Sequence, residues 1–174
     1  MPRRDAFGKI LVIVLILAAA PVLFSEECPA GWKNTSRAES GGGDLVAAES
    51  CKKDGVCLEV YGFEGEIWAR LSLAEDWGRG IDPASPPTAS VDNKRPLEPE
   101  LYIVDGREVR FQIWDGRGKM PKQMRRWIKG RKVLIRFIST SGEVEKAEFS
   151  LRGSSPAIKR VVRTIYRTEG GEGK

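Results

Sequence analysis

The stretch that decides the fold covers residues 131–167 and reads RKVLIRFISTSGEVEKAEFSLRGSSPAIKRVVRTIYR. In its first half, apolar and polar residues alternate, which predicts two strands, Lys132–Ser139 and Glu143–Leu151. Ser141-Gly142 lies between them and predicts a tight turn, because glycine adopts a positive φ without a steric cost. The stretch therefore predicts an antiparallel hairpin.

The second half of the stretch predicts a helix. Gly153 interrupts the strand pattern, Ser154 or Ser155 can cap the helix, and Pro156 suits its first turn, where a missing N–H does no harm. Apolar residues then recur at helical spacing, while cations occupy the opposite face. The apolar residues are Ile158, Val161, Val162 and Ile165. We expect an amphipathic C-terminal helix that packs on the hairpin.

The rest of the chain adds strands and one short helix. The segments with strand-like patterns are Val56–Phe63, Glu66–Ala74, Leu101–Val104 and Glu108–Trp114. Apolar residues at helical spacing predict a short helix over Met120–Lys129, which Gly130 ends. Closely spaced strands with one terminal helix favour a mainly β fold. We expect a small antiparallel β-sandwich or barrel with a short internal helix and a C-terminal amphipathic helix.

Two segments are expected to carry little regular structure. Glu26–Gly43 is predicted to be weakly structured apart from Trp32, and residues 78–99 form a Pro-rich loop. Because proline fixes φ and removes a backbone donor, we expect no helix or strand in this loop. A loop of that length in a compact domain is either functional or disordered. A scaffold or protein-interaction role through this loop is therefore one alternative for the protein.

The N-terminus has the composition of an export signal. Arg3, Arg4 and Lys9 precede an uncharged apolar stretch, Ile10–Phe24, that is short for a membrane span. Residues 1–25 are predicted to be a signal peptide, with an N-terminal anchor in the inner membrane as the alternative. A single β-rich domain then covers residues 26–168, and residues 169–174 form a disordered tail. The expected location is periplasmic or secreted.

Export would place the three cysteines in an oxidising compartment. Cys51 and Cys57 bracket Asp54-Gly55, a strong turn signal, so a disulfide across this hairpin is sterically reasonable. Cys28 is then left over, and it could instead pair with either of the others, because three cysteines do not fix their connectivity. Two cysteines without a histidine make a poor zinc site, so no metal is predicted.

The chain resembles the invasion-associated locus B family of bacterial periplasmic proteins in four features. They are the leader, the opening that bears Trp and Cys, the later hairpin and the ending F-S-L-R-G-S-S-P-A-I-K. The matching residues are Phe149–Gly153 followed by Ala157-Ile158, and the resemblance covers mainly Arg107–Val162. The resemblance implies an extracytoplasmic β-domain without known catalysis, and it implies no catalytic residues.

Charge is distributed unevenly along the chain, whose formal net charge is +5. Residues 26–106 hold 16 acidic and 8 basic side chains, whereas residues 107–136 hold 11 basic and 2 acidic ones. The cations concentrate in a patch close to Trp127 and Trp114. Its members are Arg117, Lys119, Lys122, Arg125, Arg126, Lys129, Arg131 and Lys132.

Such a patch, with Trp127 as a candidate contact, is typical of a surface that attracts an anionic partner. Lipid headgroups, lipopolysaccharide, another polyanion or an acidic protein surface would all fit. Nucleic acid is not expected, because an exported protein rarely meets it. The alternative is a solvated face whose charge is balanced by the acidic first half of the chain.

Catalysis is not predicted. The chain has no histidine, which removes the commonest general base and the commonest metal ligand. Six carboxylates were weighed as members of an acid/base pair, but their spacing does not distinguish two of them from surface charges. They are Glu64, Glu66, Glu75, Asp76, Asp105 and Asp115. We assign no catalytic residue and no cofactor, keep a hydrolase as the second alternative, and expect an exported, non-catalytic binding domain of the cell envelope.

Overall fold

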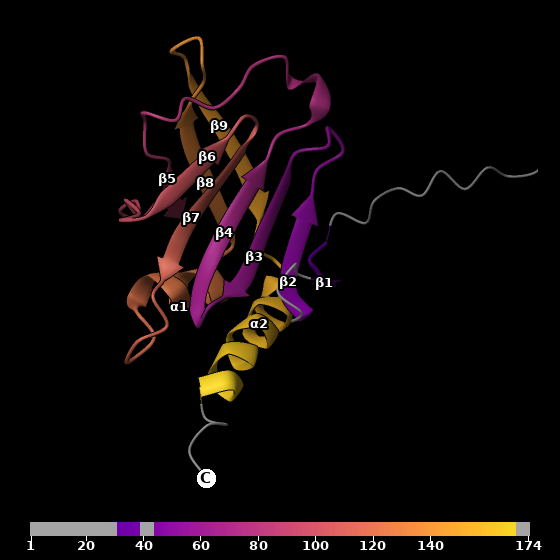
Figure 1. The fold of residues 1–174 in the computed structure, drawn as a ribbon, viewed down its shortest axis with the longest axis vertical. Coiled ribbons are helices and arrows are strands. Elements are labelled where there is room, and N and C mark those ends of the chain that lie inside the picture. Colours follow the sequence, from indigo (N-terminus) through magenta and orange to yellow (C-terminus); the bar gives the residue numbers. More distant parts are fainter. Residues whose placement is uncertain (1–30, 39–43, 170–174) are drawn as a thin grey trace, which may run out of the picture.

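A computed structural model describes residues 31–38 and 44–169 of the chain (Figure 1). Within these residues the chain forms two antiparallel sheets and two α-helices, so the predicted mainly β, sandwich-like fold is confirmed. The predicted leader and Cys28 lie outside the described residues, and so do residues 170–174 of the predicted tail.

The larger sheet has six strands in the order β1-β2-β3-β4-β7-β6. Their bounds are Lys33–Ala38 for β1, Asp44–Cys51 for β2, Cys57–Phe63 for β3, Glu66–Ser72 for β4, Tyr102–Asp105 for β6 and Glu108–Trp114 for β7. All neighbouring strands in this sheet are antiparallel. The four predicted strands that belong to this sheet are therefore confirmed as β3, β4, β6 and β7.

The smaller sheet contains the predicted hairpin. It has the order β5-β8-β9, with β5 at Thr88–Val91, β8 at Lys132–Ile138 and β9 at Val144–Ser150. Gly142 in the turn has a φ of 83°, the conformation for which glycine was expected there. The hairpin that opens residues 131–167 thus forms as its sequence predicts.

Two α-helices follow the two predicted helical patterns. They are α1 at Lys122–Lys129 and α2 at Ser154–Glu169, and a single 3-10 turn lies at Glu75–Trp77. α2 contacts β1, β2 and β3, and it also contacts α1. In the described part of the chain, neither helix is long and apolar enough to cross a bilayer.

One apolar core joins the two sheets and the helices. It collects inward-facing residues such as Val60, Phe111 and Ile135 from the strands, together with Ile158 from α2 and Trp127 from α1. In Figure 1 the smaller sheet lies behind the larger one, while α2 crosses the lower part of β2 and β3. The two helices therefore lie at one end of the sandwich.

Three strands and one helix end differ from the sequence-based expectation. β1 lies in the segment predicted to be weakly structured, and β2 was not predicted at all. β5 lies inside the Pro-rich loop, where no regular element was expected. It forms because the residues between Pro87 and Pro96 pair with β8 on one side, so the prolines flank the strand and do not interrupt it. α2 continues to Glu169, so the predicted tail begins inside this helix.

Candidate anion-binding surface

α1 is held against the core by three buried side chains, and its cations therefore face the solvent. The buried side chains are Met124, Trp127 and Ile128. Trp127 lies 6.4 Å from Phe111 of β7, measured between ring centroids, which fixes the helix to the larger sheet. The cations on the other side of the helix are Lys122, Arg125, Arg126 and Lys129, of which Arg126 is half-buried.

Gly130 ends α1 and determines how closely the helix approaches the smaller sheet. Its N–H donates to the Arg126 carbonyl oxygen at 2.7 Å. A Cβ atom on Gly130 would lie 2.4 Å from Val91 Cγ1 and 2.7 Å from the same carbonyl oxygen. The absence of a side chain therefore lets β5 pack directly against the end of α1, and this contact sets the position of the cations.

The cations of α1 have no carboxylate partner among the residues that the structure describes. Arg125 is held by its own segment, because its Nε and Nη2 donate to the Met120 carbonyl oxygen at 3.3 and 3.2 Å. Within residues 31–38 and 44–169, no ion pair joins Lys122, Arg126 or Lys129 to an Asp or Glu. Cations that share a face without counter-charges raise the local positive potential.

α2 adds cations that the sequence analysis did not assign to the patch. Its buried face points to the core, and the exposed face carries Lys159, Arg160 and Arg163. None of these three has an ion pair in the described part of the chain. Because α1 and α2 are in contact, their cations lie at the same end of the molecule. The amphipathic pattern of α2 was visible in the sequence, but its contact with α1 was not.

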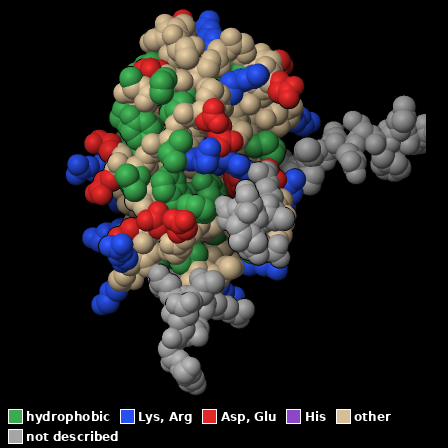
Figure 2. Space-filling view, in the orientation of Figure 1, with side chains coloured by type: hydrophobic (Ala, Val, Ile, Leu, Met, Phe, Trp, Pro, Cys, Tyr) green, Lys and Arg blue, Asp and Glu red, His purple; other side chains and the backbone are tan. Residues whose placement is uncertain are grey.

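We name this surface the basic end. It comprises the exposed or half-buried cations of α1, of the loop before it and of α2: Arg117, Lys119, Lys122, Arg125, Arg126, Lys129, Lys159, Arg160 and Arg163. Figure 2 shows Lys and Arg groups projecting at the lower left, beside the place of α1 in Figure 1. The loop before α1 is held by two contacts: Trp114 Nε1 donates to the Arg117 carbonyl oxygen at 3.3 Å, and the Arg117 N–H donates to Asp115 Oδ1 at 3.0 Å.

Three residues of the predicted patch have other roles. Trp127 is only 1 % exposed, so it is part of the core and offers no surface to a partner. Its position at helical spacing with Met124 and Ile128 explains this burial. Lys132 Nζ forms an ion pair with Glu148 at 3.1 Å, which compensates its charge. Arg131 is exposed but is joined to a loop by its backbone.

Asp92 provides that backbone contact. Its Oδ1 accepts the N–H groups of Arg131 at 2.9 Å and of Lys132 at 3.1 Å. The hydrogen bond from Arg131, followed by that from Lys132 and by the nearby positive charge, holds the pKa of Asp92 below its ordinary value although partial desolvation opposes this. The carboxylate thus fixes the start of β8 next to α1.

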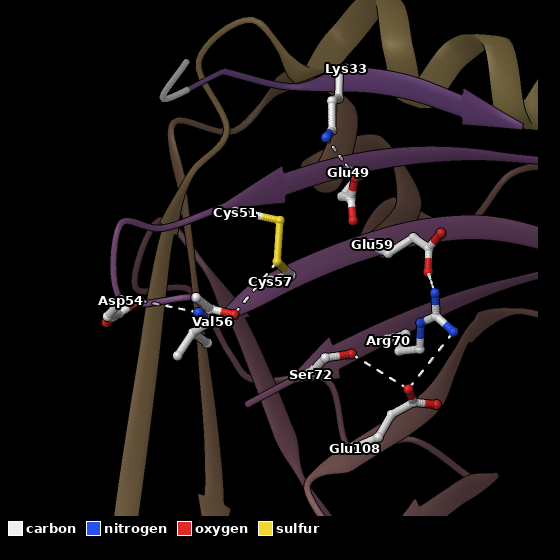
Figure 3. The surroundings of a disulfide bond; sticks show 11 residues. Lys33, Glu49, Cys51, Asp54, Val56, Cys57, Glu59, Arg70, Ser72 and Glu108 are labelled. Atoms are coloured by element: carbon white, nitrogen blue, oxygen red, sulfur yellow. Dashed lines mark hydrogen bonds and ion pairs between the residues drawn. A yellow bond between two sulfur atoms is a disulfide. The ribbon is translucent and has the colours of Figure 1, made fainter. Parts of the chain in front are cut away.

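The face of the larger sheet that points away from the core has a different electrostatic character. Ion pairs join its charges. Three of them cross between strands and are drawn in Figure 3: Lys33–Glu49 (3.2 Å), Glu59–Arg70 and Arg70–Glu108 (3.7 Å). A fourth, Arg110–Glu108 (2.9 Å), lies within β7. Because Lys33, Arg70 and Arg110 each have a carboxylate partner, these residues leave no comparable surplus of positive charge on this face. The basic end is the better candidate for binding an anion.

The predicted disulfide is present. Cys51 at the end of β2 and Cys57 at the start of β3 lie directly opposite each other and are bonded (Figure 3). Their sulfur atoms and a carboxylate oxygen of Glu49 lie within 4.8 Å of one another. Metal binding by cysteine requires thiolates, which a disulfide does not provide, so this group does not form a metal site in the bonded state.

The six carboxylates considered for catalysis lie around two groups of neighbouring turns. Glu64 is in the β3–β4 turn and Glu66 follows it, and Asp115 lies beside this turn, because Ile67 pairs with Trp114 and Gly116 closely approaches Gly65. Glu75 and Asp76 lie in the 3-10 turn, and Asp105 ends β6 shortly before Arg107, whose side chain donates to the Glu75 carbonyl oxygen. Glu66 Oε2 accepts the indole N–H of Trp68 at 2.9 Å, and Asp115 accepts the N–H of Arg117. These two carboxylates therefore have local structural contacts, and the placement does not single out a catalytic pair.

Comparison with known proteins gives one weak likeness. No protein-family model matches the chain, and no curated protein matches it. Among solved structures, the chain is similar to that of invasion associated protein B from Bartonella henselae, with a TM-score of 0.41 and 13% sequence identity. The alignment covers 78% of this chain and 85% of that chain. The weak resemblance indicated by the ending of the sequence is thus also found by structure.

Proposed function

We propose that the protein is an exported, non-catalytic domain of the cell envelope that binds an anionic surface through the basic end. The partner we consider is the headgroup layer of anionic phospholipids. The apolar leader pattern supports export, and the two packed helices supply a surface broad enough to meet a membrane. Several adjacent cations are suited to this partner, because each Lys or Arg near an anionic bilayer contributes roughly 1 kcal/mol.

One observation carries the proposal: α1 and α2 bring their cations to one end of the molecule, and none of these cations has an ion pair in the described part of the chain. A merely solvated face would be expected to interleave both signs of charge, as the outer face of the larger sheet does. α1 contains four cations and no acidic residue.

The proposal is tested by co-sedimentation with vesicles of phosphatidylglycerol and phosphatidylcholine, compared with phosphatidylcholine alone. We expect binding only to the anionic vesicles, and we expect it to weaken as salt is raised. The triple variant Lys122→Gln, Arg126→Gln, Lys129→Gln should bind about 100-fold more weakly, because about 3 kcal/mol of attraction is removed. Glutamine is a good helix former, so α1 should persist.

The matched control carries the same loss of charge elsewhere: Arg79→Gln, Arg107→Gln and Lys146→Gln, three exposed cations outside both helices, near the β6–β7 turn and on β9. It should bind like the native protein. If both triple variants lose affinity equally, binding reflects net charge and not the basic end. If the native protein ignores phosphatidylglycerol at low salt, the proposal is wrong.

A further inference from the structure

β9 is an edge strand of the smaller sheet, and most of its outer backbone groups have no partner among the residues that the structure describes. It pairs with β8 on one side only, because the smaller sheet has the order β5-β8-β9. Two hydrogen bonds fix which residues face β8: Ser139 N–H donates to the Glu143 carbonyl at 2.9 Å, and Leu151 N–H donates to the Arg131 carbonyl at 2.8 Å. In an antiparallel ladder the bonded residues alternate. The odd-numbered residues of β9 therefore bond to β8.

The even-numbered residues of β9 consequently direct their N–H and C=O groups away from the sheet. Trp32 confirms this direction, because its indole N–H donates to the outward carbonyl oxygen of Ser150 at 2.6 Å. Val144, Lys146 and Glu148 are exposed, and no such partner occupies their outward groups in the described part of the chain. An extended chain laid along β9 would find several backbone partners in a row.

A surface pocket of about 250 Å³ adjoins this edge. Glu148, Phe149, Ser150 and Arg152 form one wall, and the β2–β3 turn forms the other. Trp32 lies at its side, where it bonds to Ser150. The pocket thus combines an unpaired strand edge with room for side chains of a bound segment.

The charge of the pocket selects the kind of segment. Lys52, Lys53 and Arg152 line it, and Glu148 is the one carboxylate among its lining residues. Glu148 is already paired with Lys132, which lies outside the lining. Lys52 Nζ sits 5.0 Å from the centre of the Phe149 ring, which holds this cation at the pocket wall. Lys52 and Arg152 alone therefore give the lining a surplus of positive charge.

We propose that β9 and this pocket bind an extended acidic peptide segment of a partner protein by strand addition. Backbone hydrogen bonds to Lys146 and its even-numbered neighbours supply the attachment, and the cations of the pocket select acidic side chains. This surface is separate from the basic end in the residues that form it, so the inference does not depend on the lipid-binding proposal.

The probe is a fluorescent, capped peptide of sequence TVEVEVT, and its control has lysine in place of both glutamates. Fluorescence anisotropy with the full chain measures binding. We expect the acidic probe to bind at least tenfold more tightly than the lysine peptide. Neutralising the pocket with Lys52→Gln and Arg152→Gln should remove most of that preference, because the selecting charges are gone.

A proline substitution tests the strand edge. Lys146→Pro removes an outward N–H without breaking a bond to β8, and proline is tolerated where the N–H side of an edge strand faces solvent. The matched variant Lys146→Ala loses the same side chain and charge but keeps the N–H. We expect Lys146→Pro to bind at least tenfold more weakly than Lys146→Ala. If Lys146→Pro fails to fold, Val144→Pro makes the same test at the exposed start of β9.

Several results would overturn the proposal. Equal binding by the proline and alanine variants would exclude strand addition, and equal binding of both peptides would exclude charge selection. If the native chain dimerises and Lys146→Pro abolishes the dimer, the edge of β9 pairs with a second copy of this chain and not with a partner's peptide. Binding that appears only after removal of the residues before Gly31 would assign it to this chain's own N-terminal segment.

Discussion

Tyr61 is a titratable residue whose burial changes its pKa. It lies on the outer face of β3 with Ala47 and Trp68, and it is 9 % exposed. Burial raises the pKa of Tyr61 to about 12, although the positive charges of Arg110 and Arg70 act in the opposite direction. The small aromatic cluster on this charged sheet face therefore changes the pKa of one of its members by a measurable amount.

The raised pKa of Tyr61 predicts a loss of stability in alkali. The ordinary value is 10.0, so above this pH an unfolded chain releases the phenol proton while the folded chain retains it. The unfolded state then binds fewer protons, and the free energy of unfolding falls as pH rises from 10 towards 12. We expect the free energy of unfolding to be about 1 kcal/mol lower at pH 11 than at pH 9 for this reason.

The check is urea unfolding at pH 9, 10 and 11 for the native chain and Tyr61→Phe. The free energy of unfolding of the native chain, minus that of Tyr61→Phe, should fall as pH rises from 9 to 11. Phenylalanine has no proton to lose, so only the native chain is affected. A difference that is constant over this range would contradict the raised pKa.

Single residues also show how far the sequence predicts the site. The cations of α1 could be identified from their clustering, and their exposure agrees with the amphipathic pattern. The helical spacing that Trp127 shares with Met124 predicts a core position for it, and Trp127 is core. The pairing of Lys132 with Glu148 depends on strand register, which the sequence alone does not determine.

At the scale of elements, predictability follows the strength of local periodicity. β8 and β9 alternate clearly and were predicted nearly to their ends. β1 reads KNTSRA and has one apolar residue, so nothing in it marks a strand, and it forms by pairing with β2 along its full length. β5 is four residues long and forms because β8 offers an edge. Such strands are decided by tertiary contacts.

The disulfide is the clearest covalent element, and its removal should be measurable. Cys51 and Cys57 close a loop of a few residues, with a sequence separation of 6. Closing a loop this short restricts the unfolded chain by about 2 kcal/mol in the chain-entropy description. The double variant Cys51→Ala, Cys57→Ala should lose about that much stability in urea unfolding and keep its β-sheet circular dichroism.

Reduction of the native chain should lower its stability by a similar amount and leave the double variant unchanged, which separates the loss of the bond from the loss of the side chains. A reductant effect of equal size in both proteins would show that this disulfide does not stabilise the hairpin.

At the scale of the whole molecule, the distribution of charge follows the layers of the fold. On the outer face of the larger sheet Lys33, Arg70 and Arg110 pair with carboxylates, whereas the helix cations of the basic end have no ion pair in the part of the chain that the structure describes. The sequence predicts the surplus of positive charge in residues 107–136. It does not predict that the cations of α2 extend this surface, because their position depends on the packing of α2 against α1, and the hairpin separates these helices in the chain. The basic end is therefore larger than the predicted patch.

The most direct test of the anion-binding account is lysine acetylation of the native chain by a water-soluble reagent, read by mass spectrometry with and without phosphatidylglycerol vesicles. If only the basic end meets the membrane, Lys122, Lys129 and Lys159 become protected while Lys146 on β9 keeps its reactivity. Anion binding by the basic end is ruled out if no lysine is protected, or if Lys146 is protected while the helix lysines stay reactive.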